Sequence, residues 1–269
     1  SVAAAVLSEQ GCNAVGLMMR LWSESHSNGN SVHNRCCAPD AVARARKVAA
    51  QLDMPFYVVD ARDTFRSKVV DFFVDGYVSG VTPNPCLECN RHVRWDFLLR
   101  KALDLGATHL ATGHYARVRE LDGEYQLLRA VDTGKDQSYA LSVLGQEQLA
   151  HTLFPVGEHT KTQVRELARS FDLPVVDLRE SQDLCFLADR DYRRFLREHA
   201  PAAMQAGPIV DIHGQQLGEH QGLPQYTIGQ RKGIGVAAPV PMYVVATEME
   251  TNTLVVGPRE ALGGNSLRA

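Results

Sequence analysis

The first 111 residues alternate between helical and extended patterns of apolar and polar positions. Residues 65–77 place Phe65, Val69, Phe72, Phe73 and Tyr77 on one face of a helix, the spacing of an amphipathic element. Helices are expected at residues 2–10, 39–52, 65–77 and 92–105, and strands at 14–19, 56–59 and 108–112. Helices that alternate with short apolar strands are typical of parallel βαβ units. The pattern therefore predicts an α/β domain built on a parallel sheet.

The pattern changes after Tyr115. Residues 116–130 predict a β-hairpin that turns at Asp122-Gly123, and helices are expected at about 138–150, 161–171 and 189–198. Beyond Gly207, short strands alternate with glycine-rich turns and end in a hairpin over residues 242–257. A small β domain is therefore expected after the α/β domain.

Composition and charge exclude several classes of protein. The 269 residues are 45% hydrophobic and 22% charged, which is typical of a globular protein. Because no apolar run could cross a bilayer and no signal peptide is recognisable, we expect a cytoplasmic protein with no membrane partner. The net charge of −3 neither indicates nor excludes a nucleic-acid partner, since binding depends on local basic patches. The six cysteines, with Cys36 and Cys37 adjacent, do not resemble a secreted disulfide framework.

Residues 82–90, Thr-Pro-Asn-Pro-Cys-Leu-Glu-Cys-Asn, place two cysteines in a loop restricted by two prolines. The CxxC pair could be half of a zinc site, for which only Cys36 and Cys37 offer a second pair. It could also be a thioredoxin-like dithiol, or a reactive cysteine that acts with a distant partner. Cys185 is a candidate for that partner, although a lone cysteine between Leu and Phe is more often simply buried. The residues alone leave these alternatives open.

Two further positions are candidates for ligand binding because of their place in the expected sheet. Met19 and Gly113 follow the carboxyl ends of expected strands, where open parallel sheets bind ligands. The basic residues of 91–101, 190–197 and 231–232 cluster locally, but for each cluster taken alone a solvated helix face is the better explanation.

Taken together, the motifs resemble the tRNA-specific 2-thiouridylase family, in family order and over nearly the whole chain. The segments that carry the resemblance are Ser1-Val-Ala-Ala-Ala, Gly16-Leu-Met-Met19 with Trp22, Cys36-Cys37, Thr82-Pro-Asn-Pro-Cys-Leu-Glu-Cys-Asn90, Ala111-Thr-Gly-His-Tyr115, Lys135-Asp-Gln-Ser-Tyr139, Leu153-Phe-Pro-Val-Gly157, Ser181-Gln-Asp-Leu-Cys-Phe186 and Tyr226-Thr-Ile-Gly-Gln-Arg-Lys-Gly-Ile-Gly235.

The resemblance implies a parallel sheet of the adenine-nucleotide α-hydrolase (PP-loop ATPase) type, followed by a small β domain. An N-type ATP pyrophosphatase catalytic domain is expected over residues 1–200, with a helical extension from about 138, and a central β domain over 206–269. ATP, with Mg²⁺, is the implied cofactor, and Ser1, Met19 and Gly113 are the implied nucleotide contacts. Because Ser1 resembles the last serine of the family's phosphate-binding loop, the chain looks truncated before it and before a C-terminal β-barrel. We therefore expect the chain to be inactive by itself.

The family's reaction implies roles for the cysteines and for a tRNA surface. ATP adenylates the C2 oxygen of the wobble uridine of tRNA, and a sulfur nucleophile then displaces AMP. Cys89 is implied as the nucleophile, and Cys185 as the persulfide carrier that forms a transient disulfide with it. A sulfur-relay protein or a cysteine desulfurase is the implied sulfur donor. The implied tRNA contacts are Asn84, Pro85, Cys86, His114, Lys135, Asp136 and Gln137.

Two alternatives to this enzyme remain. One is another ATP pyrophosphatase that acts on a small molecule. The other is a zinc-stabilised RNA-binding module that uses Cys36, Cys37, Cys86 and Cys89. Residues 226–235 similarly fit either a turn that follows phosphates or a hairpin that supports the β domain.

Overall fold

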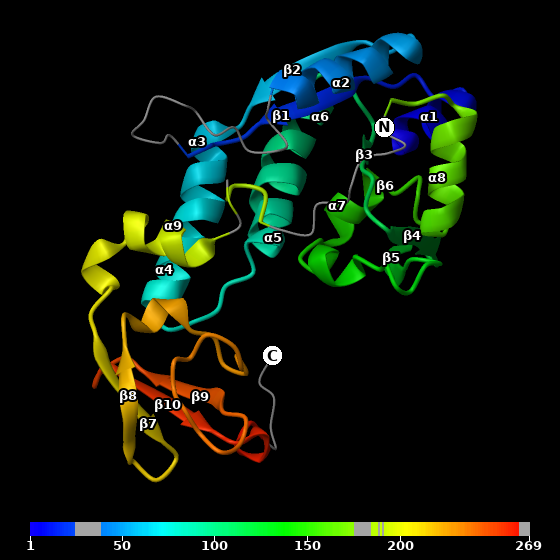
Figure 1. The fold of residues 1–269 in the computed structure, drawn as a ribbon. Helices are drawn as coiled ribbons and strands as arrows, with labels where there is room; N and C mark the ends of the chain where they lie inside the picture. Colours follow the sequence, from blue (N-terminus) through cyan, green and yellow to red (C-terminus); the bar gives the residue numbers. More distant parts are fainter. Residues whose placement is uncertain (25–38, 175–183, 188, 190, 264–269) are drawn as a thin grey trace. The chain divides into compact units, whose positions relative to one another are not determined.

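The computed structural model describes residues 1–24, 39–174, 184–187, 189 and 191–263 (Figure 1). The chain divides into two compact units. The first comprises Ser1–Val70 and Pro85–Arg190, and the second comprises Asp71–Asn84 and Asp191–Ala269. The sequence does not indicate that residues 71–84 belong with the second unit.

The first unit contains two parallel strand pairs. Strand β1 (Gly16–Arg20) pairs with β2 (Phe56–Asp60), and β3 (Leu110–Ala111) pairs with β6 (Thr152–Leu153). The three strands expected before residue 115 are thereby confirmed, although β3 is shorter than expected. Strand β6 was not predicted, because two residues are too few to show an alternating pattern.

The helices of the first unit vary in geometry. Its α-helices are α1 (Val2–Glu9), α2 (Pro39–Gln51), α3 (Arg62–Phe65), α5 (Pro85–Glu88), α6 (Leu99–Asp104), α7 (Gln146–Ala150) and α8 (Lys161–Ser170). Two segments, η1 (Arg66–Val70) and η2 (Cys89–Leu98), are π-helical, and η3 (Ser138–Leu141) is a 3₁₀-helix. Helix α1 packs on α8, and both flank the strands in Figure 1.

The expected hairpin is confirmed. It consists of β4 (Ala116–Leu121) and β5 (Glu124–Arg129), paired in antiparallel register. Asp122 and Gly123 connect them with φ angles of 54° and 81°. These left-handed conformations suit a two-residue hairpin turn, which is why this dipeptide was a reliable signal.

Two expectations for the first unit were wrong. The segment of residues 80–90 is not a loop throughout, because a helix begins at Pro85, where a proline in the first turn loses no hydrogen bond. The single helix expected over residues 138–150 is divided into η3 and α7. Gly145, with φ −91° and ψ −176°, is extended and separates them, and its N–H donates to Oε1 of Gln148 at 3.0 Å.

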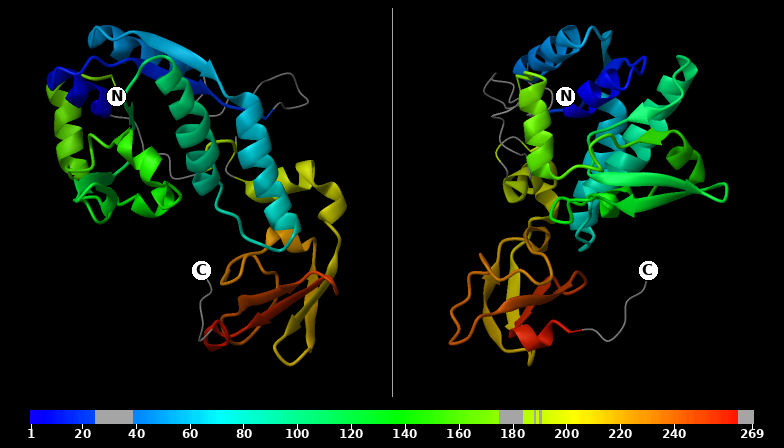
Figure 2. Two further views of the ribbon diagram at one scale, coloured as in Figure 1. Left: turned by 180° about the vertical axis from the view of Figure 1, so that it is seen from behind. Right: turned by 90° about the vertical axis from the view of Figure 1, so that its right-hand side faces the viewer.

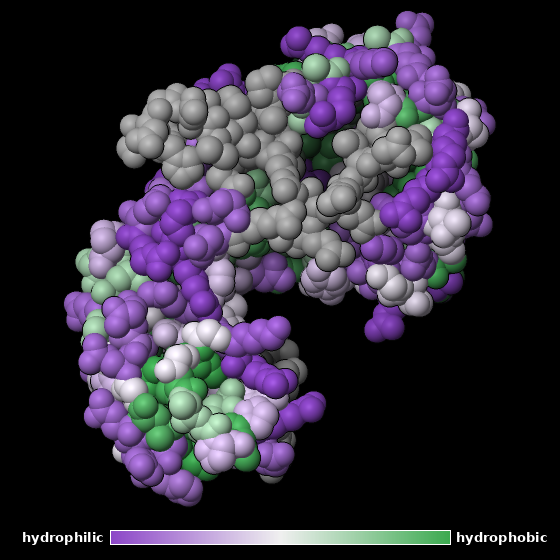
Figure 3. Space-filling model, viewed as in Figure 1, coloured by the Kyte–Doolittle hydropathy of each residue, from purple (hydrophilic) through white to green (hydrophobic). Residues whose placement is uncertain are grey.

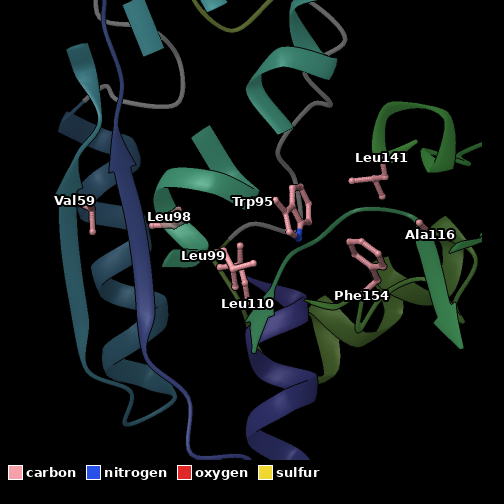
Figure 4. Close-up of a cluster of buried hydrophobic side chains, with 8 residues drawn as sticks. All are labelled: Val59, Trp95, Leu98, Leu99, Leu110, Ala116, Leu141 and Phe154. Carbon is pink, nitrogen blue, oxygen red and sulfur yellow. The ribbon is translucent and has the colours of Figure 1, made fainter. Parts of the chain in front are cut away.

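The core of the first unit centres on Trp95 (Figure 4). The Trp95 and Phe154 rings lie 6.1 Å apart, and Leu141 from η3 lies near them in the close-up. The Trp95 Nε1 donates to Oγ1 of Thr152 at 2.6 Å, and this hydroxyl donates to the Gln148 carbonyl at 2.6 Å. The core thus joins helix η2 to the strand pair β3–β6.

The second unit is a small β domain with two helices. Its sheet has the order β8-β7-β10-β9, seen side by side in Figure 2, with only β7 and β10 parallel. The strands are β7 (Gly207–Asp211), β8 (Gln216–His220), β9 (Tyr243–Glu248) and β10 (Thr253–Gly257). The remaining elements are α4 (Asp71–Val78), α9 (Tyr192–His199), η4 (Pro201–Ala203), η5 (Leu223–Gln225) and η6 (Arg259–Ala261).

The structure confirms the expected hairpin at the end of the β domain. It also shows that one helix begins later than expected. Strands β9 and β10 pair in antiparallel register. Helix α9 begins at Tyr192 and not at residue 189, because the Asp191 side chain accepts hydrogen bonds from the N–H groups of Arg193 and Arg194. An aspartate in this position caps a helix. The apolar core of the unit consists of Ile209, Leu223, Ile234, Val244, Leu254 and Val256.

Candidate functional site

The two cysteines of the CxxC motif lie in a helix. Cys86 is the second residue of α5 and is exposed, whereas Cys89 begins η2 and is only 9% exposed. Although much of Cys86 is exposed, partial desolvation of its sulfur, followed by the nearby Cys89, raises the pKa of the Cys86 thiol, so this group is protonated near neutral pH. Asn84, before the helix, belongs to the second unit, whereas Pro85 and Cys86 belong to the first.

Asn90 fixes the CxxC helix to a distant segment. Its buried Nδ2 donates to the Ala140 carbonyl at 2.6 Å, and α5 contacts η3. Because Ala140 lies in η3, the residues directly before η3 are held near the CxxC helix. These residues include Lys135, Asp136 and Gln137, for which contacts with tRNA were expected.

Gln137 joins this segment to the histidine loop. The Tyr115 N–H donates to Oε1 of Gln137 at 3.0 Å, and the Gln137 N–H donates to the Tyr115 carbonyl at 2.8 Å. His114 therefore lies beside the segment that precedes η3. Three motifs that are far apart in the sequence thus meet in the first unit: the CxxC helix, His114-Tyr115 and residues 135–137.

His114 is neutral in this environment. Its ring lies 5.6 Å from Trp95 and 6.1 Å from Phe154, and its Nδ1 shares a 2.8 Å hydrogen bond with Oγ1 of Thr112. Burial, together with the nearby Arg94 guanidinium, lowers the pKa of His114 to about 3. An uncharged imidazole can stack or share a hydrogen bond with a ligand, but it offers no positive charge to a phosphate.

Asp136 stabilises the loop in which it lies. Its carboxylate accepts hydrogen bonds from the Ala130 N–H at 2.9 Å and from Oγ of Ser138 at 2.8 Å. Partial burial opposes ionisation of this group, but these hydrogen bonds outweigh it and lower the pKa of Asp136. The carboxylate therefore positions the loop, and a contact of Asp136 with tRNA stays a prediction.

Cys185 lies in a turn that packs on α3, and η2 contacts the same helix. The Cys185 side chain is half-buried, and the next residue, Phe186, packs against Phe65 of α3 with a ring distance of 6.1 Å. Helix α3 in turn contacts η2, which begins at Cys89. None of Cys12, Cys86, Cys89 and Cys185 is part of a disulfide bond. The pairing of Cys89 with Cys185 stays a prediction.

The three residues expected to contact the nucleotide lie at or just beyond the ends of three different elements. Ser1 is the N-cap of α1, Met19 is the penultimate residue of β1, and Gly113 follows β3. A Cβ atom built on Gly113 would meet no atom within 4 Å. Packing therefore does not require glycine at this position, and open space beside it fits the close approach of a ligand.

The described residues contain neither a metal-binding cluster nor a membrane-spanning helix. Within them, no group of three or more His, Cys, Asp or Glu side chains could hold a metal ion. The zinc alternative also needs Cys36 and Cys37, which lie outside the described residues, as do residues 181–183 of the Cys185 motif. No helix in the described part of the chain is long and apolar enough to cross a membrane.

The glycine-rich segment of residues 226–235 and the residues that follow it up to 242 contain no strand, so the hairpin considered for residues 226–235 is not present. Gln230 supports this segment, because its side chain accepts from the Thr227 N–H and donates to the Lys232 carbonyl. A hollow of about 420 Å³ lies along residues 231–242, and Figure 3 shows apolar residues gathered on the face of the second unit in view. This loop shapes the β domain, while a contact with phosphates stays a prediction.

Comparisons with known proteins identify the family to which the chain is similar. A family model described as the tRNA methyl transferase HUP domain matches residues 1–189, and one described as the tRNA methyl transferase PRC-barrel domain matches residues 193–258. The chain is 50% identical over 263 residues to the tRNA-specific 2-thiouridylase MnmA of Chloroflexus aggregans, covering 97% of this chain and 73% of the relative. Proteins of the same name from Clostridium perfringens and Heliobacterium modesticaldum are both 47% identical.

These two matches cover 97% and 100% of this chain and 72% and 70% of the relatives. The family models carry the words methyl transferase, whereas these relatives are named 2-thiouridylases. Both models match in chain order, and the relatives align along nearly the whole sequence. The chain therefore belongs to the tRNA-specific 2-thiouridylase family, with an α/β domain of the HUP, PP-loop type followed by a PRC-barrel-like β domain.

Proposed function

We propose that the protein is a tRNA sulfurtransferase that uses ATP to place sulfur on C2 of the wobble uridine. The observation that carries this proposal is the meeting of the CxxC helix with His114 and residues 135–137 in one unit. Asn90 and Gln137 hold these segments together through hydrogen bonds at 2.6–3.0 Å. The names of the relatives support tRNA as the substrate. Cys89 and Cys185 are not joined in a disulfide bond, as a persulfide on Cys185 requires before transfer begins.

The first half of the proposed reaction activates the base. The C2 oxygen of uridine attacks the α-phosphate of ATP, pyrophosphate leaves, and the oxygen becomes part of an AMP leaving group. Ser1, Met19 and Gly113 are the proposed nucleotide contacts, and Mg²⁺ would neutralise phosphate charge there. Asn84, Pro85 and Cys86 are the proposed contacts with the base. The protonated thiol of Cys86 can donate a hydrogen bond to it.

The second half transfers the sulfur. The terminal sulfur of a persulfide on Cys185 attacks C2, and AMP departs with its oxygen. The Cys89 thiolate then attacks the Cys185 sulfur, which releases 2-thiouridine and leaves a disulfide between the two cysteines. An external thiol reductant supplies two electrons to reopen this disulfide. A sulfur-relay protein or a cysteine desulfurase is the proposed source of the persulfide.

The test is sulfur incorporation into a tRNA transcript that carries a wobble uridine. Because the chain is expected to be inactive by itself, the full-length protein is incubated with ATP, cysteine and a cysteine desulfurase, and 2-thiouridine is measured by mass analysis of the digested tRNA. Cys89→Ser and Cys185→Ser should each abolish the product, because each removes one of the two sulfur atoms that the transfer needs. Cys12→Ser, at an exposed free cysteine, is the control and should keep full activity. Product formation by both active-site variants would contradict the proposed chemistry.

A further inference from the structure

Arg94 is a half-buried cation in η2 for which the described residues supply no hydrogen-bonding or acidic partner. Its Nε is fully enclosed and has no hydrogen-bond partner in the structure. Nearby arginines of the same helical region behave differently. Arg91 pairs with Glu88 at 3.1 Å, and Arg100 pairs with Asp96 at 2.7 Å. Arg94 has no comparable ion pair within the described part of the chain.

The two groups whose pKa values are shifted in part by Arg94 do not supply a negative charge. Arg94 acts electrostatically on Cys86 and His114. The Cys86 thiol is protonated, since burial raises its pKa, and His114 is neutral, since burial lowers its pKa. Partial burial of a guanidinium costs free energy, because the charge loses contact with water and no ion pair offsets that loss. Such a group has a negative partner only when a ligand brings one.

The helix presents Arg94 on the same side as the CxxC motif. Cys86, Asn90 and Arg94 are spaced four residues apart, so they follow one face of the helix that runs from α5 into η2. The π-helical geometry of η2 has slightly more residues per turn than an α-helix, and such segments are frequent at functional sites. Asn90 fixes this face against Ala140. Arg94 is thus held next to Cys86 and His114 by rigid structure.

The terminal nitrogens of Arg94 are the atoms available to a ligand. Of the Arg94 nitrogens, only Nε is enclosed without a partner. The two Nη atoms are therefore accessible, and together they match the spacing of two oxygens of a phosphate.

We propose that Arg94 binds a phosphate ester group of the substrate beside Cys86 and His114. The identity of the ligand rests on the proposed function, which offers two sources of this chemistry. One is a phosphodiester of the bound RNA near the target uridine, and the other is the phosphoryl group of the adenylate. Arg94 is a binding residue in this proposal and takes no part in the covalent steps.

The test compares Arg94→Met and Arg94→Lys with the unaltered chain. The control is Arg100→Met, which removes an exposed arginine that already has a carboxylate partner. Binding is measured with an anticodon stem-loop RNA containing a wobble uridine, over a range of salt concentrations, and separately with AMP. Arg94→Met should weaken binding of at least one probe about tenfold, and for the RNA it should lower the dependence of log affinity on log salt by about one. Arg94→Lys should recover part of the affinity.

The thermal midpoint separates binding from a structural role. Arg94→Met removes an unpaired, partly buried charge, so the midpoint should stay the same or rise. Weaker RNA binding would identify a phosphodiester of the RNA as the group that Arg94 binds. Weaker AMP binding alone would identify the phosphoryl group of the adenylate instead. Unchanged binding of both probes, no measurable binding by the unaltered chain, or a lower midpoint without a binding defect would overturn the inference. An Arg94 binding defect in a protein that transfers no sulfur would instead count against the proposed function alone.

Discussion

The buried contact of Asn90 predicts how strongly the CxxC helix is anchored. In Asn90→Ala, the Ala140 carbonyl loses its donor at 2.6 Å and stays buried. An unsatisfied buried polar group costs about 1–3 kcal/mol, and the small cavity adds to this. At about 2–4 °C per kcal/mol for a chain of this size, the thermal midpoint should fall by roughly 2–12 °C. Differential scanning calorimetry measures this change, and exposed Asn13→Ala is the matched control with an expected change within about 0.5 kcal/mol.

The same variant should also expose the adjacent thiol. Cys89 is only 9% exposed and directly precedes Asn90, so loosening the helix should raise the rate at which iodoacetamide labels Cys89. Peptide mass spectrometry follows this thiol separately from Cys86. The reasoning is refuted if Asn90→Ala has the midpoint and the Cys89 labelling rate of the unaltered protein. That result would mean that apolar packing of η2, and not this hydrogen bond, holds the helix.

Two further predictions concern stability. His220 is fully buried, with Nε2 3.0 Å from the Asn252 carbonyl and Nδ1 accepting from the Gly222 N–H, and burial lowers its pKa. Between the ordinary pKa of 6.5 and this lowered value, the unfolded chain binds more protons, so the free energy of unfolding should fall as the pH drops from about 7 to 5. Urea unfolding should show a weaker pH dependence in His220→Gln, and equal slopes would contradict this assignment. Trp95→Phe removes the 2.6 Å hydrogen bond to Thr152 and reduces the volume of the buried ring. The free energy of unfolding, measured by the same urea assay, should therefore fall by about 1–3 kcal/mol. An unchanged free energy of unfolding would show that Phe fills the core equally well.

Local sequence signals determined much of the fold. The helical and alternating patterns placed β1, β2 and α2 correctly, because each follows from the apolar residues of its own segment. The Asp122-Gly123 turn was also correct, since few residue pairs tolerate two positive φ angles. The motifs named the family, which the comparisons confirm. These features depend on neighbours in the sequence, or on motifs that can be compared directly.

Long-range contacts decided the remaining features. The π-helical geometry after Cys89 has no local signal in the sequence, and the bond from Asn90 to Ala140, 50 residues away, holds this segment in place. Strand β6 exists only through its pairing with β3. The sequence placed Arg94 and Arg100 in one basic cluster, and only the tertiary structure distinguished them. It enclosed Nε of Arg94 without a hydrogen-bond partner and left Arg100 at the surface with a carboxylate, since burial and charge environment arise from segments that meet only when the chain folds.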